Sequence, residues 1–154
     1  SPKMGARIMS LGNPENKMSK SDPDGCVYLM DKPEDILRKF KRAVTDSDTE
    51  NCVRYDPTNK PGVANLMTIY SAVTGKSFDE IEQEFAGKGY GAFKPAVGEA
   101  VVELLRPIRE ESQRIMDDKA YLENVYQEGA ERARRLALKT LSKVQRKVGF
   151  VAAK

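Results

Sequence analysis

Apolar and polar residues follow one another along most of this chain with the period of an α-helix. From about residue 31 onward, apolar residues recur three or four positions apart, which places them on one face of a helix. Pro33 and Pro61 suit the first turns of two such helices, where a missing N–H costs no hydrogen bond. Ser77, with Glu80 three residues later, has the capping-box pattern that begins a third helix. A fourth helix is predicted after residue 91, with the apolar stripe Phe93, Val97, Val101, Leu104, Leu105 and Ile108.

The ends of the first two helices are predicted from short polar residues and glycine. The first helix is expected to stop between Thr45 and Asp48, where side chains that bond to the backbone favour turns. The second is expected to end at Gly75, because glycine adopts the left-handed conformation of a C-cap without strain. Their buried faces are predicted to be Ile36, Leu37, Phe40 and Val44, and Val63, Leu66, Met67, Tyr70 and Val73.

A last helix is predicted to start near Lys119 and to carry two different faces. At roughly 100° per residue the apolar and basic stripes lie nearly opposite each other. The net charge of the chain is only +3, but residues 131–147 hold seven basic residues and one acidic residue. Such a face either contacts nucleic-acid phosphates or is simply solvated, as charge runs usually are. The apolar stripe is Leu122, Val125, Tyr126, Ala130, Ala133, Ala137, Leu141, Val144 and Val148, and the basic stripe is Arg132, Arg135, Lys139, Lys143 and Arg146.

The first 30 residues show no helical period. Residues 6–9 and 26–30 are predicted to be short strands, because β-branched and aromatic residues favour that conformation. The sheet to which they would belong is missing from the chain, so their edges would be unpaired. Between them lies a polar loop whose Gly, Asn, Pro and Asp residues favour turns.

The centre of that loop is Lys17-Met18-Ser19-Lys20-Ser21. Two ammonium groups and two hydroxyls close together suit a polyphosphate, since lysine is a compact point charge and serine a short hydrogen-bond donor. A five-residue string of this kind also occurs in ordinary polar loops, so the pattern alone does not decide between the two interpretations.

Composition narrows the class of protein. Of the 154 residues, 40% are hydrophobic and 32% are charged, as in globular proteins, and no apolar run approaches the ~20 residues that a membrane helix needs. No signal peptide is apparent. The chain has no histidine, and Cys26 and Cys52 are its only cysteines. A zinc site is therefore not expected, and the two thiols are expected to be reduced in the cytosol.

Residues 17–21, followed by Asp22-Pro23, resemble the KMSKS signature of class I aminoacyl-tRNA synthetases. Further similarity runs over nearly the whole chain, and the chain resembles the carboxy-terminal part of the bacterial-type tryptophanyl-tRNA synthetases. The chain begins with Ser1, and Met4 already lies inside the similar stretch, which favours an excised fragment over a natural start. The other similar stretches are residues 2–11, 60–66, 69–71 and 87–94.

The resemblance implies a two-step reaction, in which tryptophan is activated by ATP and then transferred to tRNA(Trp). Lys17 and Lys20 are the expected catalytic residues, because they would neutralise the α-phosphate and the departing pyrophosphate. Mg²⁺ is expected to accompany ATP, but no residue of this chain is predicted to bind a metal. The expected ATP-binding residues are Ile8, Lys17, Met18, Ser19, Lys20 and Ser21, and the expected tRNA contacts are the basic stripe Arg132, Arg135, Lys139, Lys143 and Arg146.

The resemblance also implies the fold. We expect a mainly α structure, a bundle of four to five helices. It would follow a short remnant, one or two strands and the KMSKS loop, of a Rossmann-like nucleotide-binding domain. Residues 1–30 would end the catalytic domain, and residues 31–154 would form the helical, anticodon-binding domain.

The parent enzyme is expected to be cytoplasmic and a homodimer through the part that is missing here. The fragment alone is expected to be inactive, because a chain without histidine cannot supply the HIGH signature of the class. Two other interpretations remain open: a fragment of a tyrosyl-tRNA synthetase, and a non-catalytic helical RNA-binding module.

Overall fold

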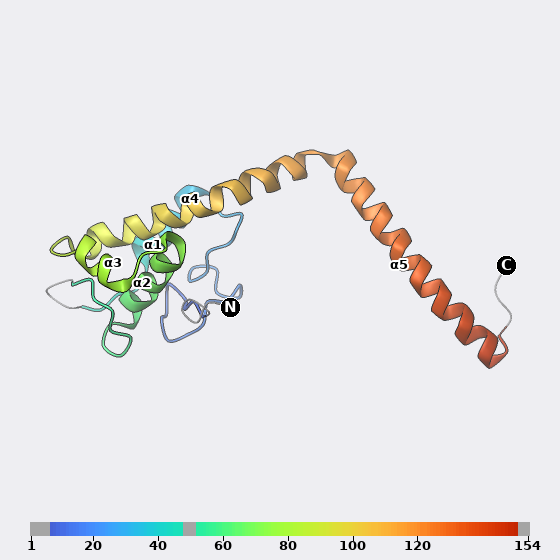
Figure 1. The fold of residues 1–154 in the computed structure, drawn as a ribbon, viewed down its shortest axis with the longest axis horizontal. Helices are drawn as coiled ribbons and strands as arrows, with labels where there is room; N and C mark the ends of the chain where they lie inside the picture. Colours follow the sequence, from blue (N-terminus) through green and yellow to red (C-terminus); the bar gives the residue numbers. More distant parts are fainter. Residues whose placement is uncertain (1–6, 48–51, 151–154) are drawn as a thin grey trace. The chain divides into compact units, whose positions relative to one another are not determined.

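The computed structural model describes residues 7–47 and 52–150, and this part of the chain is mainly helical (Figure 1). This confirms the expected fold class. The helices are α1 (Pro33–Arg42), α2 (Pro61–Thr74), α3 (Phe78–Glu84), α4 (Gly89–Asp117) and α5 (Lys119–Val148). The chain divides into two compact units, residues 1–109 and 110–154. The functional boundary expected near residue 31 stays a prediction.

The core of the first unit lies between α1, α2, α3 and the first part of α4, which Figure 1 shows gathered together. Three aromatic rings meet edge-on at its centre. The ring centroid of Phe93 lies 4.9 Å from that of Phe85 and 6.1 Å from that of Tyr70. Phe93 is fully buried, as are Ile36, Val63, Met67, Ile81 and Val97.

Helix ends follow local capping chemistry. Ser77 and Glu80 form the predicted capping box, in which the Ser77 side chain accepts from the Glu80 N–H and the Glu80 carboxylate accepts from the Ser77 N–H. Gly75 ends α2 in the left-handed conformation at φ 77°, as predicted. The prediction that the first helix stops between Thr45 and Asp48 is wrong, because α1 already ends at Arg42. The N–H of Val44 donates to the carbonyl of Leu11 at 2.8 Å instead of continuing the helix. Val44, which was predicted to be buried, is exposed.

The two strands predicted in the first 30 residues do not form among residues 7–30. The only β pairing there is an isolated antiparallel bridge between Met9 and Lys17, and Ala6 lies outside the described residues. A strand needs a continuous ladder of bonds to a neighbouring strand, and the described residues offer residues 7–9 and 26–30 no more than this single bridge. The segment is held by contacts with the helices instead, since Leu11 is buried in the core cluster.

A buried polar network joins the start of α2 to the start of α4. The Lys60 ammonium donates to Asp46 and to the Tyr90 hydroxyl, each at 2.9 Å, and the hydroxyl lies 2.8 Å from Asp46 Oδ1. Burial raises the pKa of Tyr90, so the phenol is neutral at ordinary pH. A buried charge of this kind is tolerated because it is paired and hydrogen-bonded.

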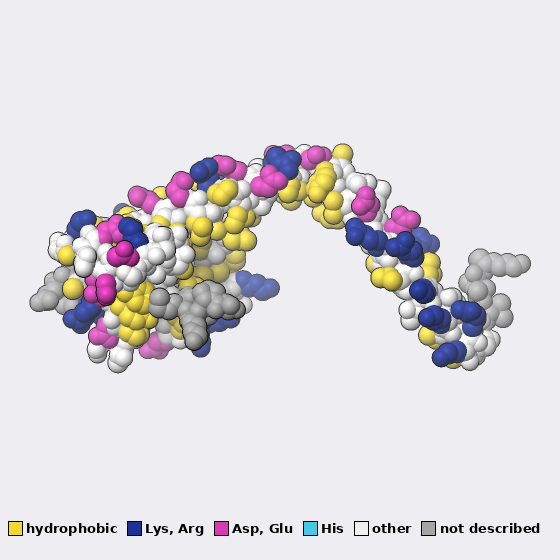
Figure 2. Space-filling model, in the orientation of Figure 1, with side chains coloured by type: hydrophobic (Ala, Val, Ile, Leu, Met, Phe, Trp, Pro, Cys, Tyr) yellow, Lys and Arg dark blue, Asp and Glu magenta, His cyan; other side chains and the backbone are white. Residues whose placement is uncertain are grey.

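The second unit comprises the end of α4 and all of α5. Helix α5 begins as predicted, with the Asp118 side chain accepting from the Tyr121 N–H, and it has no buried residue. Lys and Arg side chains (dark blue in Figure 2) therefore lie exposed along it, and so do apolar ones, such as Val125, Leu141 and Val144. None of the helices in the described residues is long and apolar enough to cross a membrane.

Candidate functional site

The residues before and after the KMSKS loop (residues 17–21) are held together by one buried serine. The Ser10 side chain donates to Asp22 Oδ2 at 2.8 Å and accepts from the N–H groups of Gly12 and Asn13 at 3.2 Å. The Ser10 N–H donates to the carbonyl of Asn16 at 2.8 Å. Ser10 is only 2% exposed, whereas Asp22 is exposed, so the hydrogen bond between them lies at the edge of the buried region. The two ends of the loop are thereby fixed at one point.

Gly25 also contacts Asp22 and helps to hold the two ends of the loop together. Its N–H donates to Asp22 Oδ1 at 3.2 Å, and its carbonyl accepts from Leu11 at 2.9 Å. A Cβ atom at this position would collide with Ser10 Oγ and with the Asp22 carboxylate. Only glycine allows the backbone to approach so closely.

We predict that Gly25→Ala releases the loop. The added methyl group would break the Ser10–Asp22 hydrogen bond, and a bond to a charged group contributes about 1.5–3 kcal/mol. Trypsin should then cut after Lys17 and Lys20 at least about tenfold faster, since cleavage follows the population of the open form. Gly12→Ala is the matched control, because its Cβ would meet atoms only at 3.9 Å. Equal cleavage of the two variants would contradict this account of the loop.

The loop is also anchored to the helices through residues 8, 9 and 18. Ile8 and Met18 pack against the hydrophobic core, and the Met18 N–H donates to the carbonyl of Ile8 at 3.0 Å. The Asn65 side chain of α2 accepts from the Met9 N–H and donates to the Met9 carbonyl, both at 2.9 Å. Asn65 is 6% exposed. Met18 therefore anchors the loop to the hydrophobic core.

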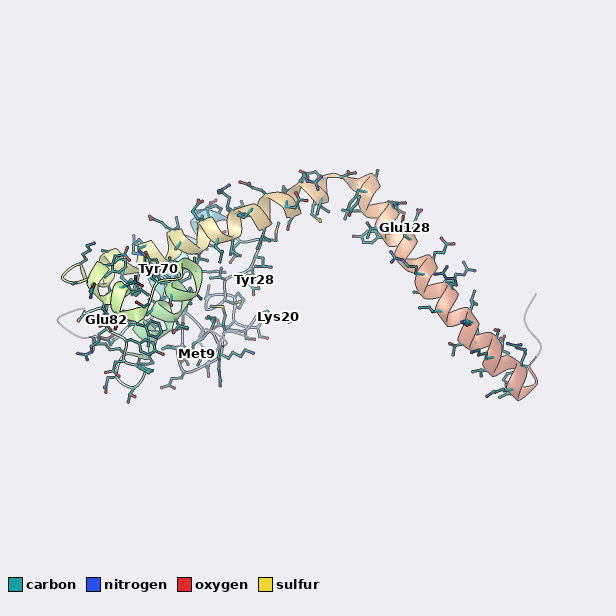
Figure 3. The ribbon with its side chains drawn as sticks, in the orientation of Figure 1. Met9, Lys20, Tyr28, Tyr70, Glu82 and Glu128 are labelled. Atoms are coloured by element: carbon teal, nitrogen blue, oxygen red, sulfur yellow. The ribbon has the colours of Figure 1, made fainter. Side chains whose placement is uncertain are left out.

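The polar residues of the motif are exposed to solvent, unlike Met18. Lys17, Ser19, Lys20 and Ser21 are all exposed, so two ammonium groups and two hydroxyls are open to solvent on a loop whose ends are fixed. The Tyr28 hydroxyl donates to the backbone carbonyl of Lys20 at 2.8 Å, and both residues are labelled in Figure 3. This arrangement can bind an anionic group such as a polyphosphate.

The structure brings together all the residues expected to bind ATP, from Ile8 to Ser21. The five expected tRNA contacts lie on α5, which belongs to the second unit. Ser10, Tyr28 and Asn65 were not anticipated as parts of the site. Asn65 is 56 residues from Met9 in sequence, so no local pattern signals their contact.

The described residues show no preformed metal cluster. No group of three or more His, Cys, Asp or Glu residues among them is arranged to hold a metal. Both oxygens of the carboxylate nearest the motif, Asp22, already accept hydrogen bonds from Ser10 and Gly25.

Comparison with known proteins defines the class. The family described as tRNA synthetases class I (W and Y) matches residues 2–106, and the chain belongs to this family. The tryptophan–tRNA ligase of Wolinella succinogenes is 50% identical over 152 residues, which is 97% of this chain and 45% of that protein. The chain thus spans less than half the length of the curated relatives it matches.

Two solved structures resemble the fold. The tryptophanyl-tRNA synthetase of Mycoplasma pneumoniae is 31% identical, with a TM-score of 0.64. That of Campylobacter jejuni, complexed with ADP and tryptophan, is 23% identical, with a TM-score of 0.75. Each match covers 94% of this chain and 44% of the other.

Proposed function

We propose that this chain is the carboxy-terminal part of a tryptophan–tRNA ligase, which activates tryptophan with ATP and transfers it to tRNA(Trp). The observation that carries the proposal is the KMSKS loop, which is fixed at its ends by Ser10 and Asp22 and exposes Lys17 and Lys20. Membership of the tryptophan and tyrosine family supports this, and 50% identity to a tryptophan–tRNA ligase favours tryptophan over the tyrosine alternative.

In the activation step, the tryptophan carboxylate attacks the α-phosphorus of ATP and pyrophosphate leaves. Phosphoryl-type transfer depends mainly on positioning and on neutralising charge. Lys17 and Lys20 would neutralise the phosphates, and Ser19 and Ser21 would donate hydrogen bonds to phosphate oxygens or hold the loop. The backbone at Ile8 would line the adenine site. Mg²⁺ would be carried mainly by the phosphates of ATP, as is usual for this ion.

A chimera tests this proposal. This chain would replace the matching carboxy-terminal part of the W. succinogenes ligase, and ATP–pyrophosphate exchange would be measured with tryptophan and with tyrosine. We expect exchange that depends on tryptophan. The chain alone is the control and should give none, because it contains no histidine for the HIGH signature. Exchange that depends on tyrosine, or a folded chimera without exchange, would overturn the proposal.

The proposal extends to RNA through α5. Arg132, Arg135, Lys139, Lys143 and Arg146 are all exposed on it, so they are available to tRNA phosphates. The full enzyme would be a cytoplasmic homodimer that assembles through the part not present in this chain. A non-catalytic RNA-binding module remains the alternative for the helical region if the chimera gives no exchange.

We predict that Arg135→Ala combined with Lys139→Ala lowers the salt dependence of tRNA affinity in the chimera. Each lysine or arginine that neutralises a phosphate releases counterions, so the slope of log K against log salt should fall by about 1 per residue. Affinity would be measured across a salt series. Lys41→Ala combined with Arg42→Ala on α1 is the control, since both are exposed basic residues. An unchanged slope would mean that the α5 stripe is only solvated.

A further inference from the structure

We infer that Tyr28 is a positioning residue for Lys20: its hydroxyl holds the Lys20 backbone, so that the lysine side chain leaves the loop from a fixed point. The binding geometry stands on the structure alone, and the catalytic consequence rests on the proposed function.

The Tyr28 hydroxyl bonds to a carbonyl that the loop itself does not use. The Asp22 N–H donates to the Ser19 carbonyl at 3.0 Å, which makes Lys20 a central residue of a β-turn. The bond that closes such a turn leaves the carbonyl of Lys20 without a partner. Tyr28 donates to it at 2.8 Å from eight residues further along the chain. Because the contact is with the backbone, the Lys20 ammonium group stays available for a ligand.

Tyr28 is itself held in place by α1. The Lys39 ammonium group lies 4.9 Å from the centroid of the Tyr28 ring and donates to Asp31 Oδ2 and to the Cys26 carbonyl, each at 2.7 Å. Asp31 Oδ2 also accepts from the Tyr28 N–H at 3.0 Å. The side chains of Lys39 and Asp31 are only 12% and 17% exposed. The phenol that reaches Lys20 is thus oriented by a sheltered ion pair.

The arrangement matters because lysine carries its charge on a flexible four-carbon stem. An ammonium group accelerates a reaction most when its position is fixed before the charge develops. Ser10 and Gly25 fix the ends of the loop through Asp22, but Tyr28 makes the contact at Lys20 itself. Removing the hydroxyl should therefore loosen Lys20 and leave Lys17 in place.

Trypsin digestion of the chain tests the positioning directly, because the scissile carbonyl after Lys20 is the one that Tyr28 binds. In Tyr28→Phe, cleavage of the Lys20–Ser21 bond should rise by up to about tenfold relative to cleavage of Lys17–Met18, as expected from losing one hydrogen bond. Tyr55→Phe is the matched control, since Tyr55 is exposed and its ring stacks on Phe78. An unchanged ratio in Tyr28→Phe would overturn the inference.

A double-mutant cycle in the chimera tests whether the hydroxyl acts through Lys20. Tyr28→Phe alone should lower the single-turnover rate of tryptophan activation by severalfold, with little change in ATP affinity. In the Lys20→Ala background it should have no further effect. Equal effects in both backgrounds would contradict positioning of Lys20. A chimera without exchange would contradict the proposed function, whereas the trypsin ratio decides the positioning independently of it.

Discussion

Lys20→Ala in the chimera should lower the rate of tryptophan activation by about 10²–10³, with a much smaller change in ATP affinity. Negative charge builds up on the departing pyrophosphate as the bond to the α-phosphorus breaks. An ammonium group fixed at that place stabilises the developing charge more than it stabilises bound ATP, and only this difference accelerates the step. The Lys20 side chain is exposed and extends from a loop whose ends are joined by the Ser10–Asp22 hydrogen bond, so its ammonium group is available to a phosphate from a defined backbone position.

Pre-steady-state kinetics would separate the two effects by measuring the activation rate and ATP affinity independently. Lys20→Arg should restore little activity, since a planar fork replaces a compact charge. Lys41→Ala, at another exposed lysine, should have no effect. If Lys20→Ala weakens ATP binding and leaves the single-turnover rate intact, the residue only tethers the ground state.

Phe93→Ala should destabilise the first unit by about 3–5 kcal/mol. Phe93 is fully buried, and its ring meets Phe85 and Tyr70, so truncation leaves a cavity where α2, α3 and α4 come together. Domains have only about 5–15 kcal/mol of stability in total, so the variant would be close to unfolding. Denaturant unfolding followed by near-UV circular dichroism would report on Tyr70 and Tyr90 in this unit.

Leu136→Ala is the control for this prediction, because Leu136 is 67% exposed on α5 and should change stability little. A loss of less than about 1 kcal/mol in Phe93→Ala would mean that the neighbouring rings close over the space.

The features that could be predicted from sequence are those decided by neighbouring residues. The capping box at Ser77, the C-cap at Gly75 and the start of α5 all depend on side chains within one turn. The KMSKS loop was found in the same way, because the whole motif is contiguous. Its catalytic and ATP-binding roles remain predictions.

The features that could not be predicted depend on partners far along the chain. The strands expected near residues 6–9 and 26–30 had suitable residues, but strand formation is decided by a neighbouring strand. The early end of α1 follows from a bond between Val44 and Leu11, 33 residues apart. Ser10 and Tyr28 are ordinary polar residues whose importance is visible only once the loop has folded.

The pair of hydrogen bonds between Asn65 and Met9 has a thermodynamic consequence. Both backbone groups of Met9 are bound to the Asn65 side chain of α2. A shift of α2 therefore also shifts the residues that enter the KMSKS loop. Suppose that a ligand on the helical side binds with different affinity when these bonds are made and when they are broken. That ligand must then change the affinity of the loop for its own ligand, and reciprocity requires the loop's ligand to change the first affinity by the same factor.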